Sequence, residues 1–376
     1  MSTQLGMNSE PRVLDWQAIR DIGIGATFLG AGGGGDTYSG ELQLQQALED
    51  GLEVTMISVS DLSDEALVVP CGWMGAPAVQ LEKYPNGSEA LQGIAKLEQI
   101  KQQPVAAVLA IEIGGQNGLS PMVLAARKGI PIVDCDGMGR AFPQAHMVTF
   151  NIYGCSASPI IVTDEHRNCI VLETDNNLTE EKLARHIAVG MGGMCHVVDY
   201  PLTGYQVKQY AVRGTVSLAE GIGKAIRVAR QQHRDPFEAL FNFLRDTGYY
   251  KHPYCLFDGK VVDVKQKIED GFCKGTFLLE GLGENPETFQ VDFQNENLVA
   301  RRDGKVVGLV PDIITLMDRE TAQPINTENV RYGMRVKAVA TSVPPILRRP
   351  EALAVLGPEA FGIEEDYVPL EELNGA

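Results

Sequence analysis

One run of apolar residues, from residue 104 to residue 113 (PVAAVLAIEI), most constrains the fold of this 376-residue chain. A run with so little polar interruption is typical of a central strand that is buried on both faces of a sheet. A helix is predicted next, over residues 120–128, and Gly129 ends it before a second short strand at residues 130–134. Strand, helix and strand in this order indicate a crossover unit and therefore a parallel sheet.

The pattern changes near the middle of the chain. Before that point helices are expected at residues 15–29, 39–50 and 88–103, and strands at residues 53–59 and 66–70. After it, short strands are expected at residues 147–153, 159–163 and 168–173, and helices at residues 179–189, 216–232 and 236–245. From Tyr254 onward the chain is mostly strand, and two DGK segments, at residues 258–260 and 303–305, are typical of hairpin turns.

This division predicts two domains and a tail. We expect an α/β N-terminal domain with a mostly parallel sheet at residues 11–175, and a β-rich C-terminal domain of mixed α+β character at residues 176–349. Residues 350–376 form an acidic tail that we expect to pack loosely. Hydrophobic residues make up 44% and charged residues 22% of the chain, which excludes disordered and fibrous classes.

Charge and cysteine content narrow the partners and the compartment. With 32 Lys and Arg against 49 Asp and Glu, the net charge is −17, and such a surface repels nucleic acids and anionic membranes. No apolar run reaches the roughly 18 residues of a transmembrane helix, and residues 1–16 hold no secretory signal. Seven cysteines without a CxxC pair predict free thiols and a cytoplasmic location. A homo-oligomer is left open.

The first candidate site is the segment GAGGGGDTY at residues 30–38. Its four successive glycines expose backbone amides close to a helix start, where they can hold an anion or a carboxamide. Gly33, Gly34 and Gly35 are therefore predicted to bind substrate, and Asp36, directly after them, is predicted to be catalytic. No strand precedes the loop and no GKS or GKT follows, so it matches neither dinucleotide nor P-loop patterns. The alternative is a tight turn between packed helices.

The second candidate site is EIGGQN, at the carboxyl end of the long apolar strand. Ligands of open parallel sheets bind beyond the carboxyl ends of the strands. Glu112, half buried there, is predicted to be catalytic with a raised pKa, and the amide of Asn117 is predicted to bind a planar polar heterocycle. The alternative is a loop that only caps the following helix.

The third candidate site is DCDGMGRAFP, which follows the next strand. Asp134 and Asp136 point the same way if the strand continues between them. Close carboxylates either bind a metal ion or raise one pKa for acid–base chemistry, so Asp136 is predicted to be catalytic. No cofactor is required, and a divalent cation at Asp134 and Asp136 is left open. Arg140 is predicted to grip a substrate carboxylate, unless it pairs with an aspartate while Asp134 caps a helix and Asp136 forms a turn.

These three motifs together resemble the S-methyl thiohydantoin desulfurase-like family, first described as a domain of unknown function associated with hydantoinases. The resemblance extends from about residue 11 to about residue 342 and includes VPDIITLMDRETAQPINTENVRYGMRV at residues 310–336. It implies an α/β domain followed by a β-rich domain. It also implies a small-molecule substrate of the hydantoin class, a planar five-membered cyclic ureide or its sulfur analogue.

Hydrolytic removal of sulfur from such a ring needs a carboxylate base to activate water, donors for the developing negative charge and an acid for the leaving thiolate. Asp36 and Glu112 would serve as base and acid, the glycine amides as donors, and Arg140 as the anchor. A thiol nucleophile, with Cys155 as first candidate, is a minority alternative. A ring-opening hydantoinase-like amidohydrolase and a non-catalytic metabolite-binding protein are the other functions that stay open.

Overall fold

The apolar run at residues 104–113 forms strand β4, which lies near the centre of the N-terminal sheet, sheet A. In spatial order the strands of sheet A are β1 (Arg12–Val13), β2 (Thr55–Ile57), β5 (Ile132–Asp136), β4 (Val105–Ala110), β3 (Leu67–Gly75), β8 (Met194–Val198), β6 (Ile160–Thr163) and β7 (Cys169–Leu172). The pairs β2–β5, β5–β4 and β4–β3 are parallel, and β8, β6 and β7 continue the sheet in antiparallel pairing. Two short strands join it, β9 (Leu202–Thr203) beside β3 and β10 (Val212–Arg213) beside β5.

The structure is a computed structural model, and it describes residues 10–75, 79, 82–269, 272–284 and 286–375. Helices α1 (Trp16–Leu29), α2 (Tyr38–Glu49), α4 (Glu89–Lys101), α5 (Gln116–Lys128), α6 (Thr149–Ile152), α7 (Asn177–Gly190), α8 (Gly204–Tyr210), α9 (Thr215–Gln231) and α10 (Pro236–Arg245) precede the second sheet. The Asp15 side chain accepts a hydrogen bond from the Ala18 backbone N–H (2.7 Å) and is the N-cap of α1. None of the described helices is long and apolar enough to cross a membrane.

One predicted strand, at residues 147–153, is wrong, because its centre forms the short helix α6. The Thr149 backbone N–H and its hydroxyl both donate to the carbonyl of Gly137 (2.8 and 3.0 Å). Phe150 is fully buried in the N-terminal core. Packing and this local capping therefore override the β propensity of the segment.

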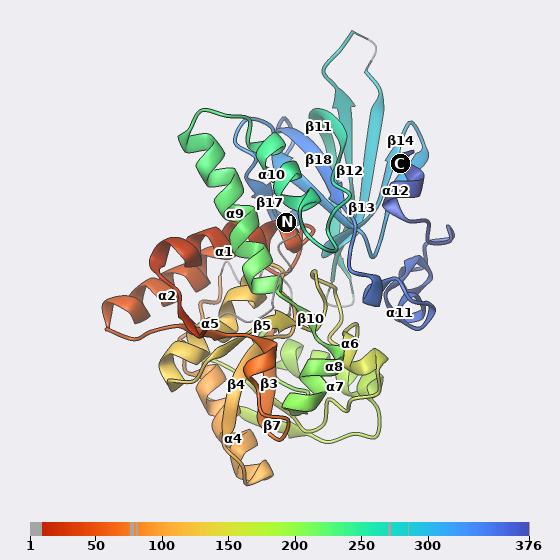
Figure 1. Cartoon of the computed structure of the whole chain (residues 1–376). Coiled ribbons are helices and arrows are strands. Elements are labelled where there is room, and N and C mark those ends of the chain that lie inside the picture. The colour runs from red at the N-terminus through yellow and green to blue at the C-terminus, as the bar shows by residue number, and fades with distance from the viewer. Residues whose placement is uncertain (1–9, 76–78, 80–81, 270–271, 285, 376) are drawn as a thin grey trace.

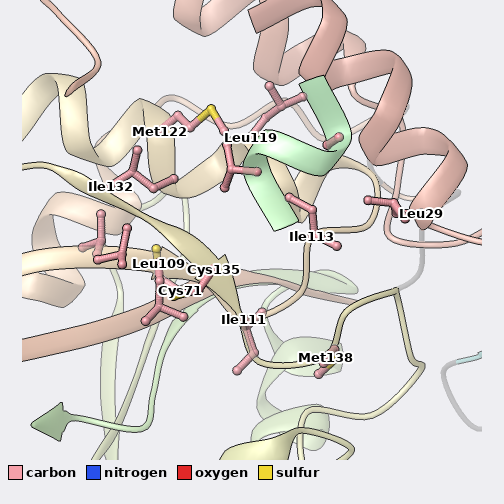
Figure 2. Close-up of a cluster of buried hydrophobic side chains, with 14 of the residues drawn as sticks. Leu29, Cys71, Leu109, Ile111, Ile113, Leu119, Met122, Ile132, Cys135 and Met138 are labelled. Atoms are coloured by element: carbon pink, nitrogen blue, oxygen red, sulfur yellow. The ribbon is translucent and has the colours of Figure 1, made fainter. Parts of the chain in front are cut away.

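The N-terminal core lies between α5 and the strands of sheet A. Figure 2 shows Leu119 and Met122 of α5 lying over Leu109 of β4 and Ile132 of β5, and all four side chains are fully buried. Burial stabilises each such side chain by roughly 1.5–3 kcal/mol. This packing fixes the first turn of α5 against the carboxyl end of β4, where the second candidate motif lies.

The C-terminal sheet, sheet B, is antiparallel throughout and lies above sheet A in Figure 1. Its strands, in spatial order, are β15 (Lys305–Leu309), β14 (Glu296–Arg302), β13 (Thr288–Gln294), β12 (Phe272–Gly281), β11 (Tyr254–Glu269), β18 (Arg335–Thr341), β16 (Ile313–Asp318) and β17 (Pro324–Ile325). The two sheets confirm the predicted α/β N-terminal domain with a mostly parallel sheet, followed by a β-rich C-terminal domain. Sheet A also takes in β8, β9 and β10, which come after residue 175.

Only one of the two predicted DGK turns is present. Asp303 and Gly304, with φ of 46° and 77°, form the turn between β14 and β15, as predicted. The segment at residues 258–260 instead lies inside β11, paired with β12 on one side and with β18 on the other. Pairing along both edges of this long strand outweighs the local preference for a turn.

The acidic tail packs more closely than we predicted. It forms α11 (Pro350–Leu356), a 3₁₀ turn at Pro358–Phe361 and α12 (Leu370–Leu373). The other 3₁₀ turns lie before the tail, at Val59–Asp61, Thr327–Asn329 and Pro345–Leu347. Leu370 is fully buried in the C-terminal core. Arg348 pairs with both Asp312 (2.6 Å) and Glu371 (2.7 Å), and so ties the tail to sheet B.

Candidate functional site

A cavity of about 90 Å³ lies where the two domains meet. Its polar lining residues are Gln116, Asn117, Glu112, Arg185, Asp199, Asn295 and Glu296. Its apolar wall includes Trp73, Met74, Ile111, Met138, Phe142, Met194 and Val197. The lining thus combines the ends of β3 and β4, the start of α5, and the turn between β13 and β14. The volume that a single water molecule needs, counted in the same way, is about 10–15 Å³. The cavity is therefore large enough for a small heterocycle.

The glycine loop forms one wall of the cavity and lies against the loop before α5. A Cβ atom on Gly34 would be 2.3 Å from the Gly114 carbonyl oxygen, and one on Gly115 would be 2.4 Å from the Gly34 carbonyl carbon. Only glycines allow this approach, and both have positive φ. The backbone N–H of Asn297, in the C-terminal domain, donates to the Ala31 carbonyl (2.7 Å) and holds the loop from the other side.

The structure places the residues predicted in the glycine loop differently from one another. Gly34 and Gly35 line the cavity, whereas Gly33 does not. Asp36 is partly buried and also lies outside the cavity lining; its carboxylate accepts a hydrogen bond from the Tyr38 amide (2.9 Å) at the start of α2. Its charge also helps to raise the pKa of the partly buried Glu328, which desolvation chiefly raises to about 7. The catalytic role of Asp36 stays a prediction.

Glu112 lies in the cavity wall, and its side chain is held by two hydrogen bonds. It is 5% exposed, and it accepts from Asn117 Nδ2 (2.8 Å) and from the Phe142 amide (3.1 Å). Burial raises its pKa to about 7 against the lowering effect of these bonds. Glu112 is therefore poised to change its protonation near neutral pH.

Asn117, predicted to bind substrate, lines the cavity but is engaged within the protein. Its Oδ1 accepts from the Trp73 amide (2.6 Å), and its Nδ2 donates to the Trp73 carbonyl (3.1 Å) as well as to Glu112. The side-chain amide thus continues the ladder of β3 and orients the Glu112 carboxyl. Both hydrogens of Nδ2 are already donated within the protein, so a ligand can contact only the exposed face of the side-chain amide.

Glu296 is a second carboxyl group in the cavity, and the sequence reasoning missed it. It is the first residue of β14 and is 2% exposed. It lies directly over Gly33, where a Cβ atom would be 1.9 Å from its Oε1. Burial and the neighbouring Glu112 raise its pKa well above the usual range, against a hydrogen bond from the Gly34 backbone. A glutamate between two strands is common, so no pattern in the sequence marks it.

Arg140, predicted to bind a substrate carboxylate, is fully buried and does not line the cavity. Its Nε donates to the Ala141 carbonyl (2.9 Å). Its terminal nitrogens donate to the carbonyls of Asn297 (3.2 Å), Pro311 (3.2 Å) and Asp312 (2.8 Å). The guanidinium thereby joins the N-terminal domain to the backbone of the C-terminal domain.

The buried Arg140 also acts on the two cavity carboxyls through its charge. It lowers the pKa of Glu112 and that of Glu296, and burial lowers its own pKa to about 10. Because its hydrogen bonds end on carbonyl oxygens, its positive charge is shared with these carboxyls rather than cancelled by a direct ion pair.

Asp136, predicted to be catalytic, lies beneath the cavity rather than in its lining. Its Oδ2 accepts from the amides of Ile113 (2.8 Å), Met138 (3.2 Å) and Gly139 (2.8 Å). It is 0% exposed, and burial raises its pKa to about 7. This position favours a role in shaping the loops after β4 and β5.

Asp134 points to a different element from Asp136. Its carboxylate accepts from the Ser217 amide (3.0 Å) and hydroxyl (2.5 Å) at the start of α9. These contacts match the alternative interpretation of Asp134, in which it caps a helix. No group of three or more His, Cys, Asp or Glu side chains in the described residues is arranged to hold a metal ion. Both oxygens of Asp134 and Oδ2 of Asp136 already accept N–H or O–H donors, and the two side chains contact different elements, so the pair does not fit a shared cation site.

Sequence comparison places the chain among known proteins. The model of the S-Me-THD-like N-terminal domain matches residues 17–174, and that of the C-terminal domain matches residues 174–370. The chain belongs to the S-Me-THD-like family. No curated protein matches it significantly. A crystal structure of a protein from Chromobacterium violaceum, a structural-genomics target, matches with a TM-score of 0.76 and 22% identity, over 96% of this chain and all of that one. This structural similarity supports the fold of the chain.

Two further polar residues of the cavity, Arg185 and Asp199, were not predicted from the sequence. Arg185 of α7 forms an ion pair with Glu181 (2.6 Å) and donates to the Pro143 carbonyl (3.0 Å). Its guanidinium stacks 4.4 Å from the ring of Phe272, at the start of β12. Periodicity identifies the helix that carries Arg185, but only the tertiary fold brings it to the cavity.

Cys155, the candidate nucleophile of the alternative thiol mechanism, does not line the cavity. It is 5% exposed, and burial raises the pKa of its thiol to about 11. Since the thiolate is the nucleophilic form, these surroundings disfavour covalent catalysis by this residue. The carboxyl pair Glu112 and Glu296 is the arrangement best suited to proton transfer.

Proposed function

We propose that this S-Me-THD-like protein is a hydrolase that acts on a small cyclic ureide and removes sulfur from a thiohydantoin-type ring. The observation that carries the proposal is that Glu112 and Glu296, from different domains, line one cavity and both have raised pKa values. Two interacting carboxyls whose pKa values differ divide the roles of acid and base between them. Family membership supports the substrate class.

The two carboxyls can be assigned from their surroundings. Glu112 accepts two hydrogen bonds and has a pKa of about 7, so it is the carboxylate that acts as general base. Glu296 Oε2 has no hydrogen-bond partner among the described residues, and burial and the charge of Glu112 raise the pKa of Glu296 well above its usual range, so we assign it the protonated form and the role of general acid. The buried charge of Arg140 stabilises whichever carboxyl is ionised.

The reaction can be written for an S-methylated thiohydantoin. Glu112 takes a proton from water as the water oxygen bonds to the ring carbon that carries sulfur. The carbon–sulfur bond then breaks, Glu296 donates its proton to the departing sulfur, and the products are hydantoin and methanethiol. A proton returns from Glu112 to Glu296 through solvent. This sequence uses no cofactor, and Asp36 and Asp136 are assigned positioning roles in it.

The experiment that tests the proposal follows two products at once. Purified protein is incubated with S-methylated thiohydantoin and, separately, with hydantoin, while thiol release and ring opening are measured. Thiol release that depends on Glu112 supports desulfurisation. Ring opening without thiol release would indicate a hydantoinase-like amidohydrolase, and tight binding without either product would indicate a metabolite-binding protein.

A further inference from the structure

Asp199 is a third carboxyl group of the cavity, and the reaction proposed above does not use it. It follows β8, it is 3% exposed, and its backbone N–H donates to the Pro70 carbonyl of β3 (3.5 Å). In sheet A, β3 lies between β8 and β4. Asp199 therefore enters the cavity from the other side of β3 than Glu112, and the two are available to different edges of one ligand.

The neighbours of Asp199 are mostly acidic or apolar. Burial raises its pKa well above the usual range, and the charges of Glu180 and Glu181 on α7 raise it further. Cys71 of β3 also lies close enough for the charge of Asp199 to raise the pKa of its thiol. Arg185, the cation of the lining, is already paired with Glu181. Such surroundings disfavour an ionised carboxylate and favour the neutral carboxyl group.

A neutral carboxyl group presents an O–H donor and a carbonyl acceptor side by side. The edge of a cyclic ureide presents the matching pair, a ring N–H beside a carbonyl oxygen. Two parallel hydrogen bonds can then form between the carboxyl group and the ring. An ionised carboxylate has no donor and would repel the ring carbonyl oxygen.

We propose that Asp199 binds the ring edge formed by nitrogen N3 and the C4 carbonyl, and thereby selects cyclic ureides among small planar heterocycles. The inference rests on the proposed function, since it names the recognition of the same ring. Carbon C2, which carries the sulfur, then faces Glu112 and Glu296. Asp199 is a specificity-determining residue in this arrangement, while the proton transfers belong to the other two carboxyls.

The test measures the binding of hydantoin, the proposed product, by calorimetry at neutral pH. Asp199→Asn keeps one donor and one acceptor and is expected to bind hydantoin within about threefold of the parent, because both hydrogen bonds survive. Asp199→Leu removes both and is expected to weaken binding roughly 10- to 100-fold, since each bond contributes about 1 kcal/mol. The ligand 3-methylhydantoin lacks the N3 hydrogen, so it is expected to bind the parent several-fold more weakly than hydantoin does and to lose less affinity than hydantoin in the Leu variant.

Several outcomes would overturn the pairing. Equal losses in the Asn and Leu variants would mean that an ionised carboxylate is needed, and unchanged hydantoin binding by the Leu variant would mean that Asp199 makes no contact. If the Leu variant does not fold, 3-methylhydantoin on the parent protein decides, because equal affinity for both ligands contradicts the pairing.

A control separates the pairing from general effects of losing a buried aspartate. Asp164 is 3% exposed, lies between β6 and β7 and does not line the cavity, so Asp164→Asn is expected to leave hydantoin affinity unchanged. A parent protein that binds no hydantoin would overturn the proposed function together with the pairing. Hydantoin binding that is insensitive to Asp199 would overturn the pairing alone.

Discussion

The carboxyl ends of β4 and β5, two neighbouring parallel strands, each carry a buried acidic residue, but the two side chains have different surroundings. Glu112, beyond β4, lines the cavity and accepts from one side-chain amide and one backbone amide. Asp136, the last residue of β5, is closed off by backbone amides that donate to its Oδ2. Burial raises the pKa of both groups to about 7.

The comparison shows that a raised pKa does not by itself separate a reacting group from a structural one. Burial raises the pKa of a carboxyl wherever it occurs, and only access to a ligand turns that shift into chemistry. At β4 the open side of the carboxyl faces the cavity, whereas at β5 the following turn covers it. The predictions below test this difference.

The largest effect is expected for Glu112→Gln. The variant keeps the size of the side chain and can still accept one of the two hydrogen bonds of Glu112, but it cannot take a proton from water. Turnover is expected to fall roughly 10²- to 10⁴-fold, the usual contribution of a general base, with hydantoin affinity nearly unchanged. Steady-state rates and calorimetry on the same preparation measure both quantities. Normal turnover would remove Glu112 from the mechanism.

For Asp136→Ala the main effect is expected on stability. The change leaves three buried backbone N–H donors without their acceptor, and each such donor costs about 1–3 kcal/mol, so the free energy of unfolding should fall by about 3 kcal/mol or more. Urea denaturation measures this loss, and Asp136→Asn, which keeps one acceptor oxygen, should lose less. A stable Ala variant without activity would instead support the catalytic role predicted from the sequence.

The pH dependence should also distinguish the two strand ends. Below a pH of about 7 Glu112 becomes protonated, so kcat/KM should fall about tenfold per pH unit. In Asp136→Asn this limb should persist but move to lower pH, because the charge of Asp136 helps to raise the pKa of Glu112. The contribution of Glu112 to the free energy of unfolding should change with pH in the opposite direction. Because the folded protein holds the Glu112 proton more tightly than the unfolded chain, this group's contribution is present at about pH 4.5 and is lost as the pH rises to about 7. Glu112→Gln should abolish that part of the stability profile.

The smallest effect is expected for Asp36→Asn. Asn is also a good acceptor at a helix start, so stability should change by less than about 1 kcal/mol. Since Asp36 lies outside the cavity lining, turnover should fall less than about tenfold, well short of the loss of an acid or base. Thermal melting and rates would show this together. A hundredfold loss of turnover in a stable variant would establish the catalytic role predicted from the sequence.

The sequence predicts those parts of the site that follow from local periodicity. The apolar run of β4, the helix after it and β5 are visible in the pattern, and they place Glu112 and Asn117 at a strand end. The glycine loop is visible as well. Cytoplasmic location and the lack of nucleic-acid and membrane partners stay predictions that rest on charge and composition.

The rest depends on contacts between segments far apart in the sequence. Glu296 is carried to the cavity by sheet B, Arg185 by α7 and Asp199 by the pairing of β8 with β3, and no local spacing records these contacts. Asp136 and Glu112 look equivalent in sequence because each follows an apolar strand. The difference between them is set by the turn after each strand, whose amides either cover the carboxyl or leave it open.

The contact between Gly33 and Glu296 has a consequence for how such chains can diverge. A side chain at Gly33 would displace the Glu296 carboxyl, so a residue of the first domain limits the position of a reacting group carried by the second. Recombination that brought in a foreign second domain would preserve both folds and still misalign the acid with the base. The two halves of the gene are therefore expected to be inherited as a matched pair, and chimeras between distant relatives should fold more often than they work.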